Sequence, residues 1–405
     1  MEKLKAREHD FSSKLRQKSV IKRLREYISW QRDQGVHPSR QDIPYFGPIS
    51  INLDLTSACN FSCPHCVDST IINTRNHLPL EDIKKSVTFL KLNGLLSVIL
   101  LGGGEPTLHP DVEEIVGYLK SKRLQVGIVT NGSRLERITE ALPLLQEKDW
   151  VRISIDAAKE RTFKELHRPK AGITLQQILK KAKKVKEINP SVSLGYSFVI
   201  VWRGLEVNGK RLKPNVDEMA QSVELGKEYG FDYISFKPCL IRLNESERES
   251  LLDHVDKDEE EEIVEEIRKN IEMAKGAANG EIKILESVNL NALLNKGADR
   301  IKKQPRRCHM QFFRTVVSPG GIFHCPAFRG IDKAKIAGSH GYTEKRKFDK
   351  CLKSTADSIL TFDAEEECKV VGCFYHDTNW WLDNVIRSKG DVGDIPMVED
   401  DNFFL

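Results

Sequence analysis

The sequence has no long apolar run. No stretch of about 18 consecutive apolar residues occurs, the length that a membrane-spanning helix requires. The N-terminus is charged from its second residue and lacks the apolar core of a signal peptide, so we expect a cytoplasmic protein. Net charge is also low, since +4 in 405 residues gives no argument for nucleic acid. We therefore expect a globular protein with neither a membrane nor a nucleic acid as partner.

Cysteine, by contrast, is present in informative number, with nine in the chain. Disulfides rarely persist in a reducing cytoplasm, so clustered cysteines there more often bind metal or take part in chemistry. One group lies between residues 59 and 66 and another between residues 308 and 373, with Cys239 alone between them. The two groups predict two places for metal chemistry, whereas Cys239 is most simply a small buried apolar residue.

The composition changes along the chain and divides it into segments. A basic extension carries an amphipathic pattern over residues 12–33, which predicts a helix that packs on the main domain or docks a substrate or partner. The acidic end of the chain is either loose or docked in a groove. We expect a basic helical extension (1–48), a strand–helix repeat (49–245), a helical connector (246–305), a cysteine-bearing region (306–387) and an acidic tail (388–405).

Apolar runs of strand length alternate with helical patterns in the second segment. The expected strands are 50–55, 97–101, 125–130, 150–155, 193–201 and 232–236, and the expected helices lie near 80–93, 110–121, 134–147, 174–188 and 217–229. Strands that alternate with helices favour a parallel sheet with helices on its faces. The predicted fold class is α/β, a partial (β/α)6 TIM-type barrel whose strand-end loops build the site.

The loop after the first strand carries three cysteines, Cys59, Cys63 and Cys66, with the spacing C-x-x-x-C-x-x-C. Thiolates are suitable ligands for iron–sulfur centres. A 4Fe–4S cluster has four irons, so three cysteines leave one iron open. A structural zinc site normally has four protein ligands, and this loop adds only His65 to its three cysteines. The pattern favours the cluster, and zinc remains the alternative.

The three-cysteine loop closely resembles the signature of the radical S-adenosylmethionine (SAM) superfamily, whose open iron chelates the amino and carboxylate groups of SAM. Gly103, Gly104, Glu105 and Pro106 follow the second strand and resemble the superfamily's GGEP motif, which binds the SAM amino group. Glycines at this position allow backbone atoms to approach a ligand closely. The resemblance covers roughly residues 50–240.

The resemblance also implies SAM-binding roles for side chains at later strand ends. Ser154 is the first candidate for the ribose and carboxylate of SAM, followed by Asn131 and Asp156, and Arg168 stands where related enzymes pair an arginine with the SAM carboxylate. Two of these have simpler alternatives, because Asn131 is typical of a turn and Asp156 of a helix cap.

The second cysteine group includes Cys308, Cys325, Cys368 and Cys373, with glycines between the first two that indicate a hairpin. This region resembles the C-terminal twitch or SPASM regions of radical SAM enzymes, which hold auxiliary 4Fe–4S clusters. The cysteine count fits one such cluster on these four residues. The last two are four residues apart where two would be usual, so Cys351 is an alternative ligand. A zinc knot or free thiols would also fit this group.

The resemblance implies a radical SAM enzyme with two 4Fe–4S clusters. SAM is cleaved reductively to a 5′-deoxyadenosyl radical that takes hydrogen from a polar substrate, a small metabolite or a peptide. The auxiliary cluster assists net oxidation or binds substrate, and an electron donor such as flavodoxin or ferredoxin is expected. The alternatives are a peptide-modifying maturase that cross-links or epimerises, and a non-catalytic iron–sulfur or zinc scaffold or electron-transfer protein.

Overall fold

The computed structural model describes residues 10–36, 43–74, 76–207, 209–242, 249–250 and 257–404. Over these ranges none of the helices is both long enough and apolar enough to span a membrane. The apolar core includes the outward-facing side chains of one large sheet together with the helices that cover it.

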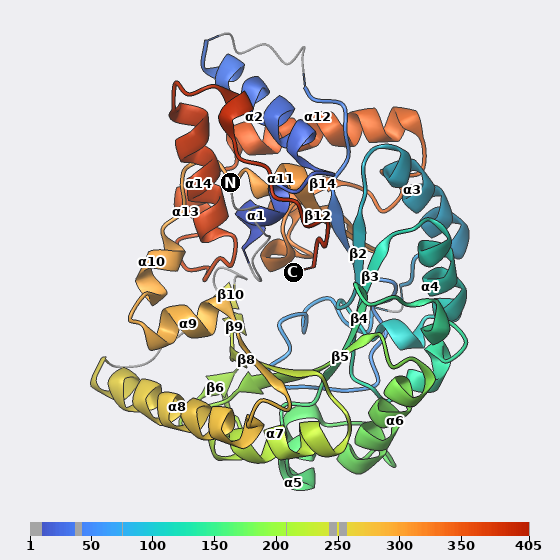
Figure 1. The fold of residues 1–405 in the computed structure, drawn as a ribbon, viewed down its shortest axis with the longest axis vertical. Helices are drawn as coiled ribbons and strands as arrows, with labels where there is room; N and C mark the ends of the chain where they lie inside the picture. The colour runs from blue at the N-terminus through green and yellow to red at the C-terminus, as the bar shows by residue number, and fades with distance from the viewer. Residues whose placement is uncertain are drawn as a thin grey trace.

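A ten-stranded sheet runs in the order β11-β8-β5-β4-β3-β2-β1-β12-β13-β14 (Figure 1). The strands are β1 (Ser50–Leu53), β2 (Ser97–Leu100), β3 (Gln125–Thr130), β4 (Trp150–Ser154), β5 (Ser193–Ile200), β8 (Tyr233–Pro238), β11 (Lys283–Glu286), β12 (Arg314–Ser318), β13 (Gly321–Phe323) and β14 (Lys335–Ala337). Every pairing from β11 to β12 is parallel, and β13 and β14 are antiparallel additions.

The six strands expected from the sequence are confirmed, and the α/β partial barrel with them. Two further parallel strands were not expected. β11 pairs with β8 at one end of the sheet and comes from the segment expected to be a helical connector. β12 pairs with β1 on the other side of the six expected strands. β12 and β13 form the hairpin that the glycines indicated.

Helices cover the outer side of the arc that these strands form, as Figure 1 shows for α3 (Leu80–Leu92), α4 (Val112–Ser121), α6 (Leu175–Ile188) and α7 (Met219–Glu228). These four match the expected helices. The helix expected over 134–147 is wrong, because two short 3-10 turns, 135–138 and 142–144, replace it. Pro143 lies within the second turn, and its ring and missing N–H oppose a continuous α-helix. An additional helix, α5 (Glu160–His167), follows β4.

Burial alternates along the strands and separates an outer face from an inner face. In β4, Val151 and Ile153 are fully buried among the outer helices, whereas Trp150, Arg152 and Ser154 are partly exposed. This alternation follows from the two-residue period of a strand. Side chains on the inner face of the arc are therefore the ones that solvent or a ligand can reach.

The two ends of the chain pack together. The extension forms α1 (Phe11–Leu15) and α2 (Ile21–Val36) instead of one helix, and between them Gln17 pairs with Val398 of the acidic tail. Buried apolar residues of α2 share a second core with α11 (Met310–Phe313) and α14 (His376–Arg387). Of the two alternatives for the tail, docking is the one observed.

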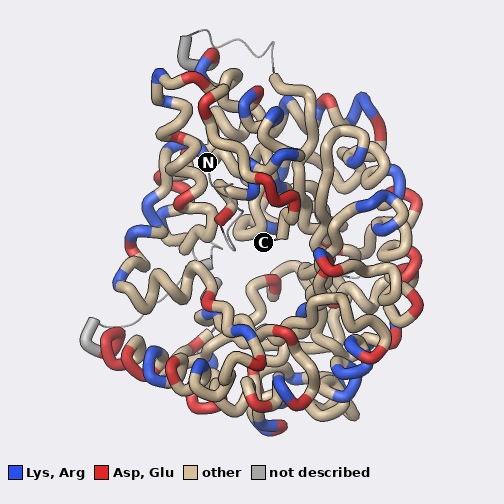
Figure 2. The backbone as a smooth tube through the Cα atoms, viewed as in Figure 1, with Lys and Arg blue, Asp and Glu red and all other residues tan. Residues whose placement is uncertain are grey.

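The remaining helices belong to the connector and the C-terminal region: α8 (Lys257–Ala278), α9 (Val288–Leu294), α10 (Ala298–Lys302), α12 (Lys345–Thr361) and α13 (Ala364–Glu367). Figure 2 shows basic and acidic residues interspersed along the outer helices. This mixture agrees with the small net charge.

Candidate functional site

The loop between β1 and α3 brings the three cysteines of the first group together, with all three thiols half-buried. The backbone N–H of Cys66 donates to the carbonyl of Cys63 at 3.2 Å, which forms a tight turn. Burial, followed by the neighbouring Cys66 and Cys59, raises the pKa of the Cys63 thiol well above its usual value. Thiolates at this position therefore need a nearby positive charge, which a bound metal cluster supplies.

The glycine-rich loop after β2 packs directly on the cysteine loop. The N–H of Glu105 donates to the carbonyl oxygen of Ala58 at 2.8 Å. A Cβ atom at Gly104 would lie 2.4 Å from the carbonyl oxygen of Thr56 and 2.6 Å from that of Ala58. Only glycine allows this contact, so the predicted motif positions the cysteine loop as well as any ligand above it.

The Glu105 carboxylate is already satisfied within the protein. It is buried and accepts hydrogen bonds from the hydroxyls of Thr107 and Thr130, both at 2.6 Å, and from the N–H of Asn131 at 2.7 Å. These bonds tie the end of β2 to the end of β3. Pro106 begins the 3-10 turn that follows. The acid of the motif thus shapes the two strand ends.

Asn131 also braces the cysteine loop. Its side-chain amide donates to Asn60 at 2.8 Å, while its oxygen accepts from the N–H of Ser133 at 2.9 Å. Asn60 in turn donates to the Ser133 hydroxyl at 2.8 Å. Since Asn60 directly follows Cys59, these bonds fix one side of the loop.

A buried imidazole contacts the second cysteine, and the sequence did not identify it. Nδ1 of His167 lies 3.3 Å from Sγ of Cys63, and its Nε2 lies 2.7 Å from the carbonyl oxygen of Ile155. A carbonyl only accepts, so Nε2 carries the hydrogen in that contact. Arg168, predicted to bind SAM, is exposed and ends α5 with a left-handed φ of 42°. Its role toward SAM stays a prediction.

Asp156 connects the same cluster of side chains to the sheet. Its carboxylate lies 3.4 Å from Nε2 of His65 and accepts from the N–H of Val199 at 2.7 Å. Burial opposes its charge, but the hydrogen bond from His65 and the nearby His167 hold its pKa below the usual value. Ser154, two residues earlier, ends β4 on the inner face and is partly exposed.

A buried arginine from the C-terminal region reaches this site. Nε of Arg329 lies 2.7 Å from a carboxylate oxygen of Asp54, and its Nη1 lies 2.8 Å from Asp68. Asp54 directly follows β1, and Asp68 follows Cys66 by two residues and accepts from the N–H of Gly103 at 3.1 Å. Arg329 therefore joins the cysteine-bearing C-terminal region to the two loops of the first site.

The second cysteine group lines one cavity of about 100 Å³. Cys308, Cys325, Cys368 and Cys373 all contribute to its wall, from positions next to α11, β13, α13 and α14. The volume is far below the roughly 300–1,000 Å³ of sites for drug-sized ligands, so it suits a small inorganic group. Cys351 lies elsewhere, buried in α12 with its thiol 3.4 Å from the carbonyl of Gly341.

Several buried polar atoms on this wall lack hydrogen-bond partners. They are Oη of Tyr375, Oδ1 of Asn289, Oε1 of Gln304 and both ring nitrogens of His324. Nδ2 of Asn379 lies 3.6 Å from Sγ of Cys308. Buried polar groups are normally satisfied, so this wall is built to face a polar or charged group.

The two cysteine groups differ from a preformed site for one metal ion, as far as the described residues show. In the described part of the chain, no three His, Cys, Asp or Glu side chains form a set that could hold a metal ion. Tetrahedral zinc, with Zn–S bonds of about 2.3 Å, requires thiols about 4 Å apart. A larger iron–sulfur cluster is the better fit to four cysteines spread around a cavity.

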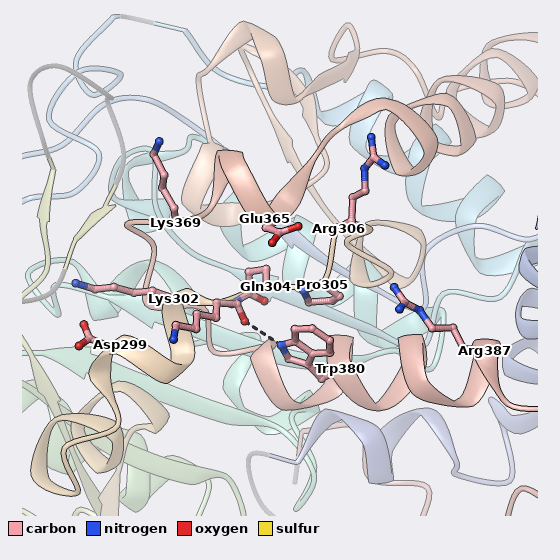
Figure 3. Close-up of a pocket in the computed structure, with 10 residues that line it drawn as sticks. Asp299, Lys302, Gln304, Pro305, Arg306, Glu365, Lys369, Trp380 and Arg387 are labelled. Carbon is pink, nitrogen blue, oxygen red and sulfur yellow. Dashed lines mark hydrogen bonds between the residues drawn. The ribbon is translucent and has the colours of Figure 1, made fainter.

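A surface cleft of about 810 Å³ adjoins this cavity (Figure 3). Basic residues outnumber acidic ones along it, and Gln304 lines both spaces. The Trp380 indole donates to the carbonyl of Lys303 at 2.8 Å and forms part of the cleft wall. Trp380 thus lines a surface beside the cavity, whereas Tyr375 lines the cavity itself.

Comparison with known proteins agrees with this geometry. Residues 53–206 match the family model described as the radical SAM superfamily. The chain therefore carries a radical SAM domain, the kind of domain that uses a 4Fe–4S cluster and SAM. The match begins at the end of β1 and includes the cysteine loop, the glycine loop and β2 to β5.

Curated relatives match part of the chain. An S-adenosylmethionine-dependent nucleotide dehydratase of Thermoplasmatales archaeon (strain ISO4-H5) is 34% identical over 125 residues, 30% of this chain and 43% of that protein. The subtilosin biosynthesis protein AlbA of Bacillus subtilis is 32% identical over 111 residues, 27% of this chain and 25% of that protein. The chain thus aligns with less than half the length of these relatives.

Solved structures share the fold over most of the chain. SuiB of Streptococcus suis bound to the precursor peptide SuiA superposes with a TM-score of 0.58 at 17% identity, covering 94% of this chain and 80% of that one. The structure of anSMEcpe with bound AdoMet gives 0.55 at 16% identity, covering 88% and 93%. At these identities the likeness concerns the fold alone.

Proposed function

We propose that this protein is a radical SAM enzyme. Cys59, Cys63 and Cys66 would hold the cluster that cleaves SAM. The observation that carries the proposal is the bracing of their loop from three sides: by Gly104 against its backbone, by Asn131 through Asn60, and by His167 at Cys63. Such bracing holds ligands in a fixed geometry, which a preorganised site requires.

When bound, the cluster and SAM together supply a 5′-deoxyadenosyl radical through one-electron reductive cleavage of SAM, and this radical removes hydrogen from the substrate. The backbone of Gly103 and Gly104 and the side chain of Ser154 would bind SAM. Glu105 and Asn131 would position the loops, since their polar atoms have protein partners. The inner face of the sheet would orient the substrate and limit access of water.

The test is anaerobic reconstitution with iron and sulfide, followed by SAM and dithionite and detection of 5′-deoxyadenosine. We expect product from the wild type and none from a variant with Cys59, Cys63 and Cys66 replaced by alanine. Cys351→Ala is the matched control, because that thiol is buried away from both groups. Well-reconstituted wild type without product would favour the non-catalytic scaffold or electron carrier.

The auxiliary cluster would be bound by Cys308, Cys325, Cys368 and Cys373. Four cysteine ligands would leave it no open iron. Its role would then be electron transfer during a net oxidation, in preference to direct binding of substrate. About eight irons per chain would support two clusters, and about four would remove the auxiliary one.

A polar substrate, a small metabolite or a peptide, is proposed, and a peptide-modifying maturase is the more specific candidate. Its support is the shared fold with SuiB bound to a precursor peptide, which extends over 94% of this chain, and the similarity to AlbA. The test is incubation with candidate precursor peptides in D2O, followed by mass spectrometry. A cross-link would appear as a loss of two hydrogens, and epimerisation as the gain of one deuterium in place of hydrogen.

The proposed electron donor is a small redox protein such as flavodoxin or ferredoxin in the cytoplasm. The basic cleft beside the cysteine cavity supports this, because an acidic face on the donor would be attracted to it (Figure 3). Lys303 and Lys369 lie on the cleft, and replacing both with glutamate should slow reduction by the donor but not by dithionite.

A further inference from the structure

Two cations lie on the inner face of the sheet, away from both cysteine groups. Arg152 is in the middle of β4, and Lys237 is near the end of β8, with β5 between these strands. Strand register places Arg152 beside Gly195 of β5 and Lys237 beside Val199. Both side chains are partly exposed, while their neighbours along the strand are buried, so both face the open side of the arc.

Neither cation has an anionic partner among the described residues. Across the part of the chain that the structure describes, neither Arg152 nor Lys237 forms an ion pair with a carboxylate, and Nε of Arg152 has no hydrogen-bond partner. Lys237 donates only a long hydrogen bond, 3.3 Å, to the hydroxyl of Ser197. Asp156 is the nearby acid, and it already contacts His65 and the N–H of Val199.

The electrostatic consequence is visible at Lys237. Burial and then the charge of Arg152 lower its pKa to about 7, although Asp156 acts in the opposite direction. A partly buried cation without a counter-charge is unfavourable. Arg152 and Lys237 are close enough for the charge of one to affect the pKa of the other. Such a pair of cations is typical of a site that binds a negatively charged ligand.

Aromatic rings support this site from below. The Trp150 ring lies over Gly127, where a Cβ would be 2.3 Å away, and the Tyr233 ring lies over Gly195, where a Cβ would be 2.1 Å away. The Arg152 guanidinium stands 5.0 Å from the Trp150 ring centre, a cation–π contact that fixes its position. The arginine is thereby held in place before any ligand binds.

The C-terminal tail packs against the aromatic rings beneath the two cations. The Phe404 ring packs edge-on against Trp150 with centroids 5.6 Å apart. The side chain of Gln125, at the start of β3, donates to the carbonyl of Asp401 and accepts from the N–H of Phe403, both at 2.9 Å. Figure 1 shows this segment on the inner side of the arc. A ligand would therefore reach the cations from the end of the sheet that carries the cysteine loop.

We infer that the substrate carries an anionic group, a carboxylate or a phosphate, and that this group binds between Lys237 and Arg152. The inference rests on the proposed function, because it places the substrate below the SAM-cleaving site. The carboxylate of SAM is a poorer candidate for this position. SAM would bind at the strand ends, including Ser154 at the end of β4, whereas Arg152 lies two residues further back along that strand.

The test is calorimetric titration of the reconstituted protein, with SAM present, using inorganic pyrophosphate and citrate as probes. We expect one saturable site per chain for at least one probe. Lys237→Met and Arg152→Met should each weaken it about tenfold or more, because each removes a charge-assisted hydrogen bond. Lys183→Met, on the exposed side of α6, is the matched control and should change nothing. Tighter pyrophosphate would indicate a phosphate-bearing substrate, and tighter citrate a carboxylate.

Three results would overturn the inference: no saturable site in the wild type, unchanged binding in both variants, or an equal loss of SAM affinity in the variants, which would assign the cations to SAM. Thermal melting gives a second measurement. Since Lys237 has no anionic partner among the described residues, Lys237→Met should melt at or above the wild-type temperature. Arg152→Met should melt lower by no more than the cation–π contact with Trp150 contributes. Failure of the proposed function can be distinguished from failure of this inference, because in that case the wild type would form no 5′-deoxyadenosine.

Discussion

Replacing Arg329 with methionine should destabilise the protein strongly while keeping most of the side-chain volume. The arginine side chain is 4% exposed and lies between Asp54, 0% exposed, and Asp68, 10% exposed. Without it, the positive charge that lies between these two buried carboxylates is lost. Removing one partner of a buried ion pair typically lowers the free energy of unfolding by about 3–5 kcal/mol.

The measurement is thermal unfolding followed by circular dichroism under anaerobic conditions. With an unfolding entropy of about 2.1 cal/mol/K per residue, a loss of that size corresponds to a fall in melting temperature of about 4–6 °C in a chain of 405 residues that unfolds as one unit. Arg306→Met is the matched control, because that arginine makes one exposed ion pair with Asp363 at 3.1 Å. Such a pair contributes about 1 kcal/mol or less.

A second substitution separates lost charge from lost packing. Asp54→Asn added to Arg329→Met removes the more buried of the two carboxylates and should recover part of the loss. If Arg329→Met melts within about 2 °C of the wild type, or if the added Asp54→Asn makes it worse, the electrostatic reasoning is incorrect. The single variant Arg329→Met should also incorporate less iron, because Arg329 contacts both loops of the first site.

Further predictions concern the two clusters and the inner-face cations. Cys308→Ala should lower iron from about eight to about four per chain, measured chemically, while Cys351→Ala leaves it unchanged; equal iron in both would refute the auxiliary assignment. Gly104→Ala should impair cluster incorporation, because the new Cβ meets backbone at 2.4 Å, whereas Gly276→Ala, with nothing within 4 Å, should be neutral or slightly stabilising in melting experiments. Anion binding should weaken about tenfold between pH 6 and pH 8, since Lys237, with a pKa of about 7, binds anions only when protonated. Arg152 keeps its charge over this range and Asp156 is already ionised, so Lys237→Met should remove this tenfold loss and leave only the pH dependence that comes from ionisation of the probe itself.

The elements that depend on local pattern were predictable. Six apolar runs became six adjacent parallel strands, and four of the five expected helices formed near the expected residues. The exception, 134–147, failed because Pro143 outweighed the helical periodicity. The four C-terminal cysteines were also selected from spacing and resemblance, and they line one cavity.

Contacts between distant segments were not predictable in this way. β12 pairs with β1 although more than 250 residues separate them, and neither strand alone indicates its partner. His167 and Arg168 are adjacent in sequence, but the left-handed end of α5 buries the first and exposes the second. Arg329 does not lie in any motif that the sequence made recognisable. Its role depends on Asp54 and Asp68, which come from another part of the chain.

The sequence by itself determined the class of domain, because three closely spaced thiols and a glycine-rich turn are local features that keep their meaning wherever the chain places them. The tertiary structure alone decided which side chains have partners. Burial and pairing are properties of groups brought together from several strands, so only the folded chain distinguishes Glu105, which is satisfied, from Lys237 and Arg152, which have no anionic partner among the described residues.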